Sequence, residues 1–391
     1  MDPTRIPHIA QAELVPSPPD DLTQPAMLGF SAASWIDLQR RAGAAFYLPE
    51  LQQTILCGDA VNKAMWRQPD DWSYARSNTG LAFRAQLGEE YITASDGESH
   101  RRQRKLLRPA FSGPALLRHL PILFELLCAR LDDLADLAEP VDLHHELIFI
   151  YTYLLNRTLV RAPVSDQQIW QFAEYEEQLI GGLRLSGAER SAWYARPDYQ
   201  SLRKLVFDHF ETLVEKRVEK RVEKRLTDTY RGDDGDADNL DLLISAMRRA
   251  GPLDKVEIVR DAYLMQAGGA GNTASLACCL LWKLTQPRGS ALERLDQALA
   301  ALLDSDQIDA QILRSPLLLA VTQEAERCFL PTPGVLKVAQ RDLTIAGFAV
   351  PAETELLHLF GMSNFMATTY PEPLQFKPER WLQGKLQRSR A

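Results

Sequence analysis

The sequence contains few cysteines, and they show no arrangement typical of a metal site. Its 391 residues include five, without a CxxC pair or a regular spacing: Cys57, Cys128, Cys278, Cys279 and Cys328. The seven histidines do not join them in the spacing of a zinc site. The N-terminus lacks the basic and then apolar order of a secretory signal, so we expect free thiols in a reducing cytoplasm.

Long apolar runs and an excess of positive charge are also missing. No stretch reaches the roughly 18 consecutive apolar residues that a membrane span needs, so we expect none. Acidic residues outnumber basic ones by 52 to 44, which gives a formal net charge of -8. Because such a chain repels phosphate backbones, we expect no nucleic-acid partner. The 46% hydrophobic content is ample for a large buried core.

The order of sequence patterns indicates a mainly α fold with a small β region. Residues 1–30 are rich in proline, and we expect an extended lead-in there. From Ala32 short β-like runs alternate with helical ones. Helical periodicity then dominates until Leu330, beyond which prolines and glycines separate short alternating runs typical of β-hairpins. No linker divides residues 31–391, so we expect one α+β domain with a sheet contributed by both ends of the chain.

Two charged segments are interpreted as ordinary surface. Val214–Arg225 reads VEKR three times, and charges spaced four residues apart favour a solvated helix face over a contact surface for a partner. The acidic stretch 227–241 contains Asp233 and Asp234, which could bind a metal or a diphosphate. The glycines on either side of them favour a solvated loop.

Two segments of the helical part have features suited to a ligand. The first, Ser95–Ser112 (SDGESHRRQRKLLRPAFS), places His100 and Arg104 on one helix face. Such a cationic pair suits a carboxylate or phosphate, although a basic helix face is usually solvated. The second, Gln266–Ser275 (QAGGAGNTAS), combines three glycines with Ala270 in a long apolar helix. Each glycine costs about 0.5–1 kcal/mol relative to alanine, which indicates either a bulky flat group against the helix or tight helix–helix packing.

A third pattern joins two distant segments. Glu324 and Arg327 lie three residues apart in EAER and can pair on a helix. After a β-rich stretch comes Phe376–Trp381, which reads FKPERW. A single ExxR is a very weak signal, but this order of segments is specific.

Taken in this order, the segments resemble the cytochrome P450 superfamily of the bacterial type. Ser95–Ser112 resembles its C-helix, Gln266–Ser275 the centre of its I-helix, EAER its K-helix motif, and FKPERW the motif that supplies a second arginine. The similarity extends over roughly residues 30–382. It implies the cytochrome P450 fold, a haem b cofactor, and oxidation of a lipophilic small molecule by a monooxygenase. It also implies a separate ferredoxin and ferredoxin reductase, because no flavin or iron–sulfur domain is present.

The resemblance also implies roles for particular residues. The family's buried structural ion triad matches Glu324, Arg327 and Arg380. His100 and Arg104 match residues that hold a haem propionate, and Lys337 lies near the position of another propionate-binding arginine. Lysine keeps the charge there but loses the two-pronged hydrogen bonding of arginine.

The I-helix departs from the family pattern. The acid–alcohol pair, which relays protons to iron-bound dioxygen in the family, aligns with Gly271 and Asn272. Glycine has no side chain to relay a proton, and asparagine does not titrate. Thr273 has a hydroxyl but matches the neighbouring threonine. These changes weaken the monooxygenase interpretation.

The cysteine that ligates the iron in the family is not found where it is expected. Trp381 is followed only by LQGKLQRSRA, and Cys328, the last cysteine, matches a K-helix position. Because thiolate donation drives O–O cleavage in these enzymes, we expect no axial metal ligand, no thiolate-ligated haem and no monooxygenase activity in this form. We interpret the chain as C-terminally truncated before the haem-ligand loop and the following helix.

Three interpretations of function remain open. The chain is a truncated monooxygenase, or a haem-free auxiliary protein (a pseudoenzyme) that assists another biosynthetic enzyme, as P450-like helpers of glycosyltransferases do. Alternatively it is a haem-free enzyme that binds an anionic ligand through His100, Arg104 and Lys337. The sequence names no substrate.

Overall fold

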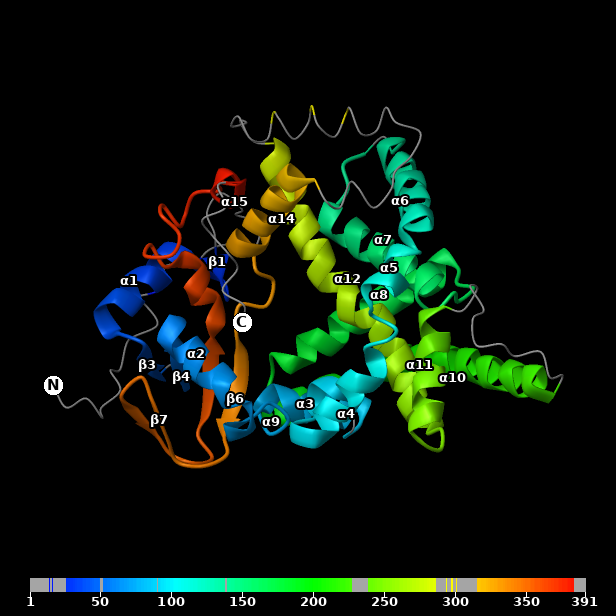
Figure 1. The fold of residues 1–391 in the computed structure, drawn as a ribbon, viewed down its shortest axis with the longest axis horizontal. Helices are drawn as coiled ribbons and strands as arrows, with labels where there is room; N and C mark the ends of the chain where they lie inside the picture. The colour runs from blue at the N-terminus through cyan, green and yellow to red at the C-terminus, as the bar shows by residue number, and fades with distance from the viewer. Residues whose placement is uncertain are drawn as a thin grey trace. The chain divides into compact units, whose positions relative to one another are not determined.

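A computed structural model describes residues 26–49, 52–89, 91–137, 139–226, 238–285 and 315–382, together with a few isolated positions. Helices dominate and the strands are short, which confirms the mainly α fold with a small β region (Figure 1). The chain divides into two compact units, Met1–Ser77 with Leu276–Ala391 and Asn78–Ser275. We call them the sheet unit and the helical unit and describe each by itself. The single-domain organisation with a lead-in over residues 1–30 stays a prediction.

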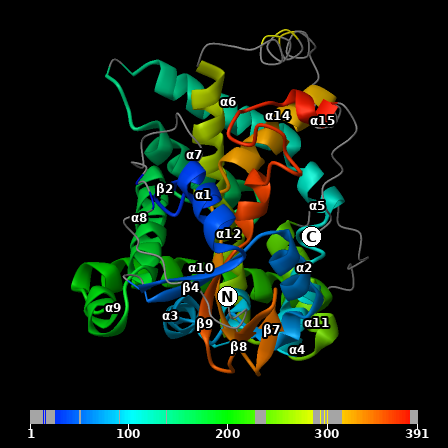
Figure 2. The same cartoon turned by 90° about the vertical axis from the view of Figure 1, so that its left-hand side faces the viewer.

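A five-stranded sheet joins the two ends of the chain in the sheet unit. Its strands, in spatial order, are β3 (Ala45–Leu48), β4 (Gln53–Cys57), β9 (Glu355–Leu359), β6 (Val335–Ala339) and β5 (Trp72–Ser73). The pairing of β4 with β9 is parallel, and the other neighbours are antiparallel. Figure 2 shows the blue N-terminal strand β4 close to the orange C-terminal strand β9. The predicted contribution of both chain ends to the sheet is confirmed.

Short elements surround this sheet. They are β1 (Ala26–Met27), β2 (Phe30–Ser31), α1 (Ala32–Ala42), α2 (Asp59–Arg67), η3 (Pro69–Asp71), α14 (Pro316–Cys328), β7 (Leu343–Ile345), β8 (Phe348–Val350), η6 (Phe360–Phe365) and α15 (Glu379–Leu382). Trp35 of α1 is buried, packs against Phe30 and Phe46, and donates its indole N–H to the Met27 carbonyl at 2.9 Å. Leu14 is buried in the same cluster.

The helical unit carries most of the helices. They are α3 (Asn78–Leu87), η4 (Ile92–Ala94), α4 (Gly97–Leu107), α5 (Gly113–Leu117), α6 (Leu120–Ala135), α7 (Leu143–Thr158), α8 (Asp166–Leu183), α9 (Gly187–Tyr194), α10 (Pro197–Leu226), α11 (Asn239–Ala250) and most of α12 (Lys255–Thr285). Their core is aromatic: the Tyr175 ring of α8 lies 5.7 Å from Tyr199 of α10 and 5.8 Å from Tyr263 of α12. This core fixes α8 against α12.

Capping explains where two of these helices begin. Ser165 and Gln168 form a capping box at the start of α8, and Asp238 and Asp241 do so at α11. Arg217 of α10 pairs with the buried Asp238 at 2.6 Å. Part of the VEKR repeat thus contacts the rest of the protein, whereas its side chains beyond 219 and the acidic segment 227–237 lie outside the described residues. Asp233 and Asp234 are therefore not described.

Candidate functional site

Glu324 and Arg327 form a buried ion pair on α14. Glu324 has no exposed surface and Arg327 is 3% exposed. The Nε and Nη2 atoms of Arg327 donate to the two carboxylate oxygens of Glu324 at 3.0 and 2.8 Å. The three-residue spacing places both on one face of the helix, as expected. A buried pair needs this two-pronged geometry, because both ions lose their hydration.

Arg380 of α15 joins the same carboxylate. Its Nε atom donates to Oε1 of Glu324 at 3.1 Å. The backbone N–H of Lys377 donates to Oε1 at 2.8 Å, and the indole N–H of Trp381 donates to Oε2 at 2.8 Å. The FKPERW segment therefore wraps Glu324 with backbone and side-chain donors. The sequence indicated the arginine but not the other two donors.

The arginines also hold the irregular segment that precedes α15. Arg327 donates to the carbonyls of Asn364, Pro373 and Gln375 at 2.9, 2.7 and 3.1 Å. Arg380 donates to the Pro371 carbonyl at 2.9 Å. Carbonyls in a segment with little regular structure need such partners, since an unpaired buried carbonyl is costly. The network thus fixes residues 364–381 onto α14.

At Gly269 and Gly271 in the glycine-rich part of α12, close packing within the described residues does not explain the glycine. A Cβ atom added to Gly269 would lie 3.4 Å from Leu155 Cδ1, and one added to Gly271 would lie 3.6 Å from Glu176 Oε1. Both are ordinary van der Waals distances. At Gly361, by contrast, an added Cβ would lie 2.9 Å from Pro333 Cβ, which is too close. Alanine would fit at Gly269 and Gly271, so tight helix–helix contact does not require glycine there.

The positions aligned with the acid–alcohol pair lie on this part of α12. Gly271 is half-buried, and both Asn272 and Thr273 are exposed. Helix α12 is continuous through all three. No ionisable side chain of α12 therefore occupies these positions, as the sequence states.

The predicted propionate-binding residues lie on α4 and β6. His100 is half-buried, and its Nδ1 atom lies 3.1 Å from the Ile92 carbonyl oxygen, which orients the ring. Arg104, one turn later on α4, is exposed, and no hydrogen bond of its guanidinium occurs within the described part of the chain. Lys337 is half-buried on β6 of the sheet unit, opposite Leu356 of β9.

Burial keeps several of the thiols protonated. It raises the pKa of Cys57 in β4 and of Cys328 in α14 to about 12, and that of Cys279 in α12 to about 11. Arg327 Nη2 donates to the Cys328 sulfur at 3.0 Å, so this thiol is already engaged in the ion network. Cys57 and Cys328 are buried, and Cys328 is held within the ion network, so neither side chain is placed to act as an axial ligand.

Two acids of the helical unit, the half-buried Glu176 and the buried Asp261, were missed by sequence reasoning. Burial raises the pKa of Glu176 on α8 to about 8. Burial, and then the charge of Glu257, raises the pKa of Asp261 on α12 to about 7. One carboxylate oxygen of each is inaccessible and makes no hydrogen bond within the described residues. Glu257, by contrast, pairs with Arg102 at 2.6 Å. The sequence could not single out Glu176, because several glutamates occur in the same helix.

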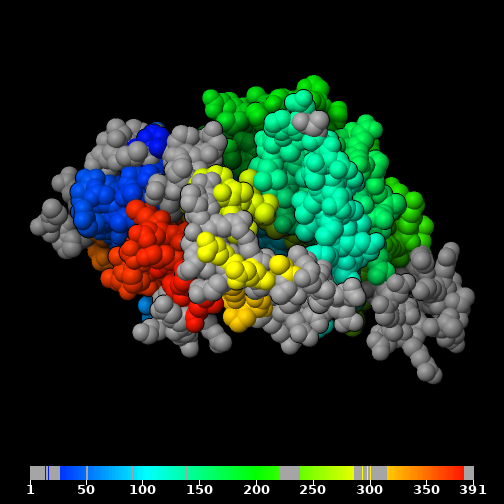
Figure 3. Space-filling view, turned by 90° about the horizontal axis from the view of Figure 1, so that it is seen from above, coloured from blue at the N-terminus to red at the C-terminus, as the bar shows by residue number. Residues whose placement is uncertain are grey.

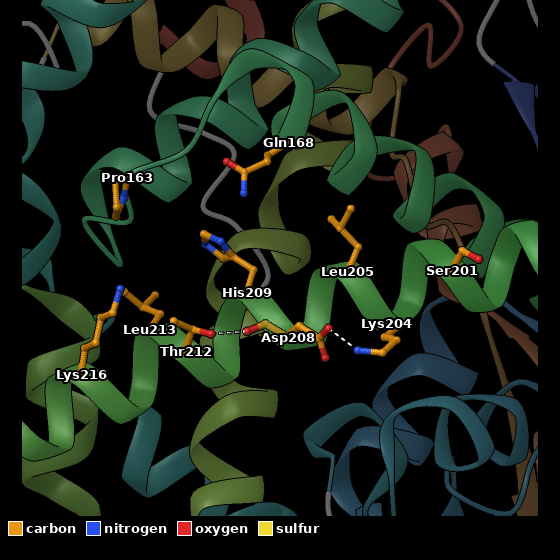
Figure 4. Close-up of a pocket in the computed structure, with 10 residues that line it drawn as sticks. All are labelled: Pro163, Gln168, Ser201, Lys204, Leu205, Asp208, His209, Thr212, Leu213 and Lys216. Atoms are coloured by element: carbon orange, nitrogen blue, oxygen red, sulfur yellow. Dashed lines mark hydrogen bonds and ion pairs between the residues drawn. The ribbon is translucent and has the colours of Figure 1, made fainter.

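A groove of about 660 Å³ lies between the start of α8 and α10 (Figure 4). His209, which points into it, has its pKa lowered by burial and then by Lys216. Lys204 pairs with Asp208 one turn along α10. Lys216 of the VEKR repeat lines this groove, but none of the predicted haem-binding or ion-triad residues does.

Within the described residues, no helix has both the length and the apolar character needed to cross a membrane.

Comparisons with known proteins agree on one family. The family model Cytochrome P450 matches residues 45–391. The chain is 27% identical over 262 residues to cytochrome P450 93G1 of Oryza sativa subsp. japonica. The aligned region covers 63% of this chain and 49% of that protein. The chain is 25% identical over 363 residues to the putative cytochrome P450 137 of Mycobacterium tuberculosis, covering 88% of this chain and 70% of that one. The chain thus spans about half the length of the first relative.

Solved structures share the fold. A retinoic acid-bound cyanobacterial CYP120A1 superposes with a TM-score of 0.71 at 20% identity, over 89% of this chain and 76% of that one. A crystal structure of the cytochrome P450 CYP102L1 superposes with a TM-score of 0.73 at 17% identity, over 96% of this chain and 83% of that one. The family model covers most of the sequence, and both solved structures share its fold. The chain belongs to the cytochrome P450 family.

Proposed function

We propose that this chain is of the haem-thiolate monooxygenase lineage and that its natural ligand is a lipophilic small molecule. The observation that carries the proposal is the glycine-rich part of α12. Protein packing does not require glycine at residues 269 and 271, which leaves this part of α12 suited to a flat group or a ligand. In this lineage, electrons would come from a separate ferredoxin and its reductase.

The residues of α4 fit one part of a haem. A half-buried imidazole oriented by the Ile92 carbonyl and an exposed guanidinium one turn away are suitable donors for a propionate carboxylate. We propose that His100 and Arg104 would hold one propionate and that Lys337 would contribute a further charge. Haem, when bound, would supply the activation of dioxygen.

The thiols do not fit the iron. Cys57 and Cys328 are buried, Cys328 already accepts a hydrogen bond from Arg327, and no cysteine follows Cys328 among these 391 residues. We therefore propose that the 391-residue polypeptide carries no thiolate-ligated haem and does not act as a monooxygenase in this form. The proposal concerns this polypeptide only.

The absorbance spectrum of the purified polypeptide with haem supplied tests this. We expect no thiolate-type Soret band in the reduced, CO-bound sample. The matched variants Cys279→Ser and Cys328→Ser should give the same spectrum as the parent. A thiolate-type band that disappears in either variant would overturn the proposal and identify the ligand.

A second candidate, a haem-free auxiliary protein, is favoured by the surface of α5 and α6. Helix α6 is rich in leucine yet contributes no fully buried side chain, and its teal atoms lie at the surface in Figure 3. Leu117 and Ile122 are each 44% exposed. Exposed apolar side chains grouped in this way are typical of a protein-binding surface.

Co-purification with a neighbouring biosynthetic enzyme tests this second candidate. We expect a complex that Leu117→Glu with Ile122→Glu abolishes, with an unchanged far-UV circular dichroism spectrum. A complex that survives both substitutions would exclude this surface.

A further inference from the structure

The groove between α8 and α10 lies within the helical unit, and none of the residues on which the proposed function rests lines it. Its volume of about 660 Å³ falls in the range of roughly 300–1,000 Å³ that small-molecule sites occupy. Part of its wall is apolar, with contributions from Pro163, Leu205 and Leu213. A hollow of this size with a partly apolar wall can hold the apolar part of a small organic molecule.

Lys216 brings an uncompensated positive charge to this groove. It is exposed and forms no ion pair with the residues that the structure describes. The other two charged residues of the groove cancel each other, because Lys204 pairs with Asp208. Figure 4 shows Lys216 on one side of His209 and the Lys204–Asp208 pair on the other. One net positive charge matches an anion with a single negative charge better than a doubly charged phosphate.

His209 provides a hydrogen-bond donor beside this charge. Its ring lies 5.1 Å from that of Phe172 and 5.4 Å from that of Phe210, so its orientation is fixed by packing. Burial, and then the charge of Lys216, lowers the pKa of His209, so the ring is neutral at pH 7. The Nε2 atom is inaccessible and makes no hydrogen bond within the described residues. Since buried N–H groups without an acceptor are rarer than buried acceptors without a donor, we assign the proton to Nδ1, which can then donate to a ligand.

Gln168 provides a second neutral donor from the other helix. Its Oε1 atom accepts a hydrogen bond from the backbone N–H of Ser165 at 3.0 Å, as part of the capping box of α8. The opposite end of the amide, the NH₂ group, lies on the side of His209 in Figure 4. Two oriented neutral donors and one ammonium group around a partly apolar groove suit a carboxylate with an apolar tail, because a carboxylate accepts several hydrogen bonds at once.

We propose that the groove between α8 and α10 binds a small amphiphilic carboxylic acid in its ionised form. The carboxylate accepts hydrogen bonds from Lys216, His209 and Gln168. The apolar part of the acid lies against Leu205 and Leu213. This site goes beyond the proposed function and does not depend on it, because no residue of α4, α12 or β6 takes part.

Calorimetric titration of the 391-residue polypeptide with n-octanoate, n-octanol and n-octylamine tests the proposal. The three probes share a chain length and differ in the charge of the polar end. We expect octanoate to bind about fivefold more tightly than octanol, the upper range that a solvent-accessible ion pair provides, and octylamine to bind most weakly. Lys216→Gln should lower the affinity for octanoate to that for octanol. Lys105→Gln, which removes an exposed lysine of α4 outside the groove, should keep the preference for octanoate.

His209→Phe gives a second test that leaves the lysine in place. Phenylalanine keeps the ring contacts with Phe172 and Phe210 but removes the N–H donor. We expect this variant to bind octanoate about fivefold more weakly than the parent and octanol equally well. No binding of octanoate, equal binding of octanoate and octanol, or a preference that survives both Lys216→Gln and His209→Phe overturns the carboxylate site. None of these outcomes alters the haem spectrum that tests the proposed function.

Discussion

Replacing Glu324 by glutamine removes the negative charge that two arginines share. The carboxylate is fully buried, and the side chains of Arg327 and Arg380 are 2% and 7% exposed. Glutamine would leave both guanidinium groups without a counter-charge and would point an NH₂ group at donors. Breaking a buried pair costs about 3–5 kcal/mol, a large part of the roughly 5–15 kcal/mol that stabilises a typical protein. We expect Glu324→Gln to lower the free energy of unfolding by about 3–5 kcal/mol.

Urea denaturation followed by far-UV circular dichroism and tryptophan fluorescence measures the change. Trp381 donates to Glu324, so fluorescence also reports on the network itself. Glu326→Gln, on the exposed side of α14, is the control and should change stability by less than about 0.5 kcal/mol. Adding Arg327→Met to Glu324→Gln should cost less than the sum of the two single changes. A loss below about 1 kcal/mol for Glu324→Gln would refute the reasoning, because the buried pair would then contribute no more than an exposed one.

Three further predictions concern two acids of the helical unit and the glycines Gly361 and Gly271. The folded-state pKa values of Glu176 and Asp261, about 8 and about 7, lie above the ordinary 4.5 and 3.8, so the folded state holds protons that the unfolded state releases. The free energy of unfolding measured by urea should therefore fall as pH rises between the ordinary and the folded-state pKa values of these acids. The double variant Glu176→Gln with Asp261→Asn should show a flatter dependence of this free energy on pH. An unchanged dependence in the variant would contradict the raised pKa values. Gly361→Ala, whose Cβ would press on Pro333, should lose about 1–3 kcal/mol in the same assay. Gly271→Ala should be neutral or gain up to about 1 kcal/mol, and a comparable loss there would show that close packing explains the α12 glycines after all.

Gly271, which occupies the acid position of the family's acid–alcohol pair in α12, lies beside the acid Glu176 of α8. Gly271 and Asn272 offer no ionisable group on α12, yet the Glu176 carboxylate lies against Gly271. A side chain larger than alanine at residue 271 would meet that carboxylate. The loss of the family pattern in α12 and the presence of an acid on α8 at this point are thus sterically compatible.

Local sequence patterns were enough to identify the family-level features. The three-residue spacing of Glu324 and Arg327 determines that both lie on one helix face, since a turn has 3.6 residues. Short alternating runs after Leu330 determine strands, because β-structure has a period of two. The predicted fold class, the joint sheet of the two chain ends and the place of each motif on its helix or strand therefore needed no coordinates.

Only the tertiary structure decided which groups meet across long separations. Glu174, Glu176 and Glu177 are equivalent in composition, and only packing of α8 against α12 turns Glu176 inward. The donors from Lys377 and Trp381 to Glu324 likewise depend on the path of residues 364–381, which follows no regular period. Local patterns report the face of one element, whereas burial and unpaired charge are properties of two elements in contact. For this reason the sequence determined the scaffold, and the structure located the acid beside α12.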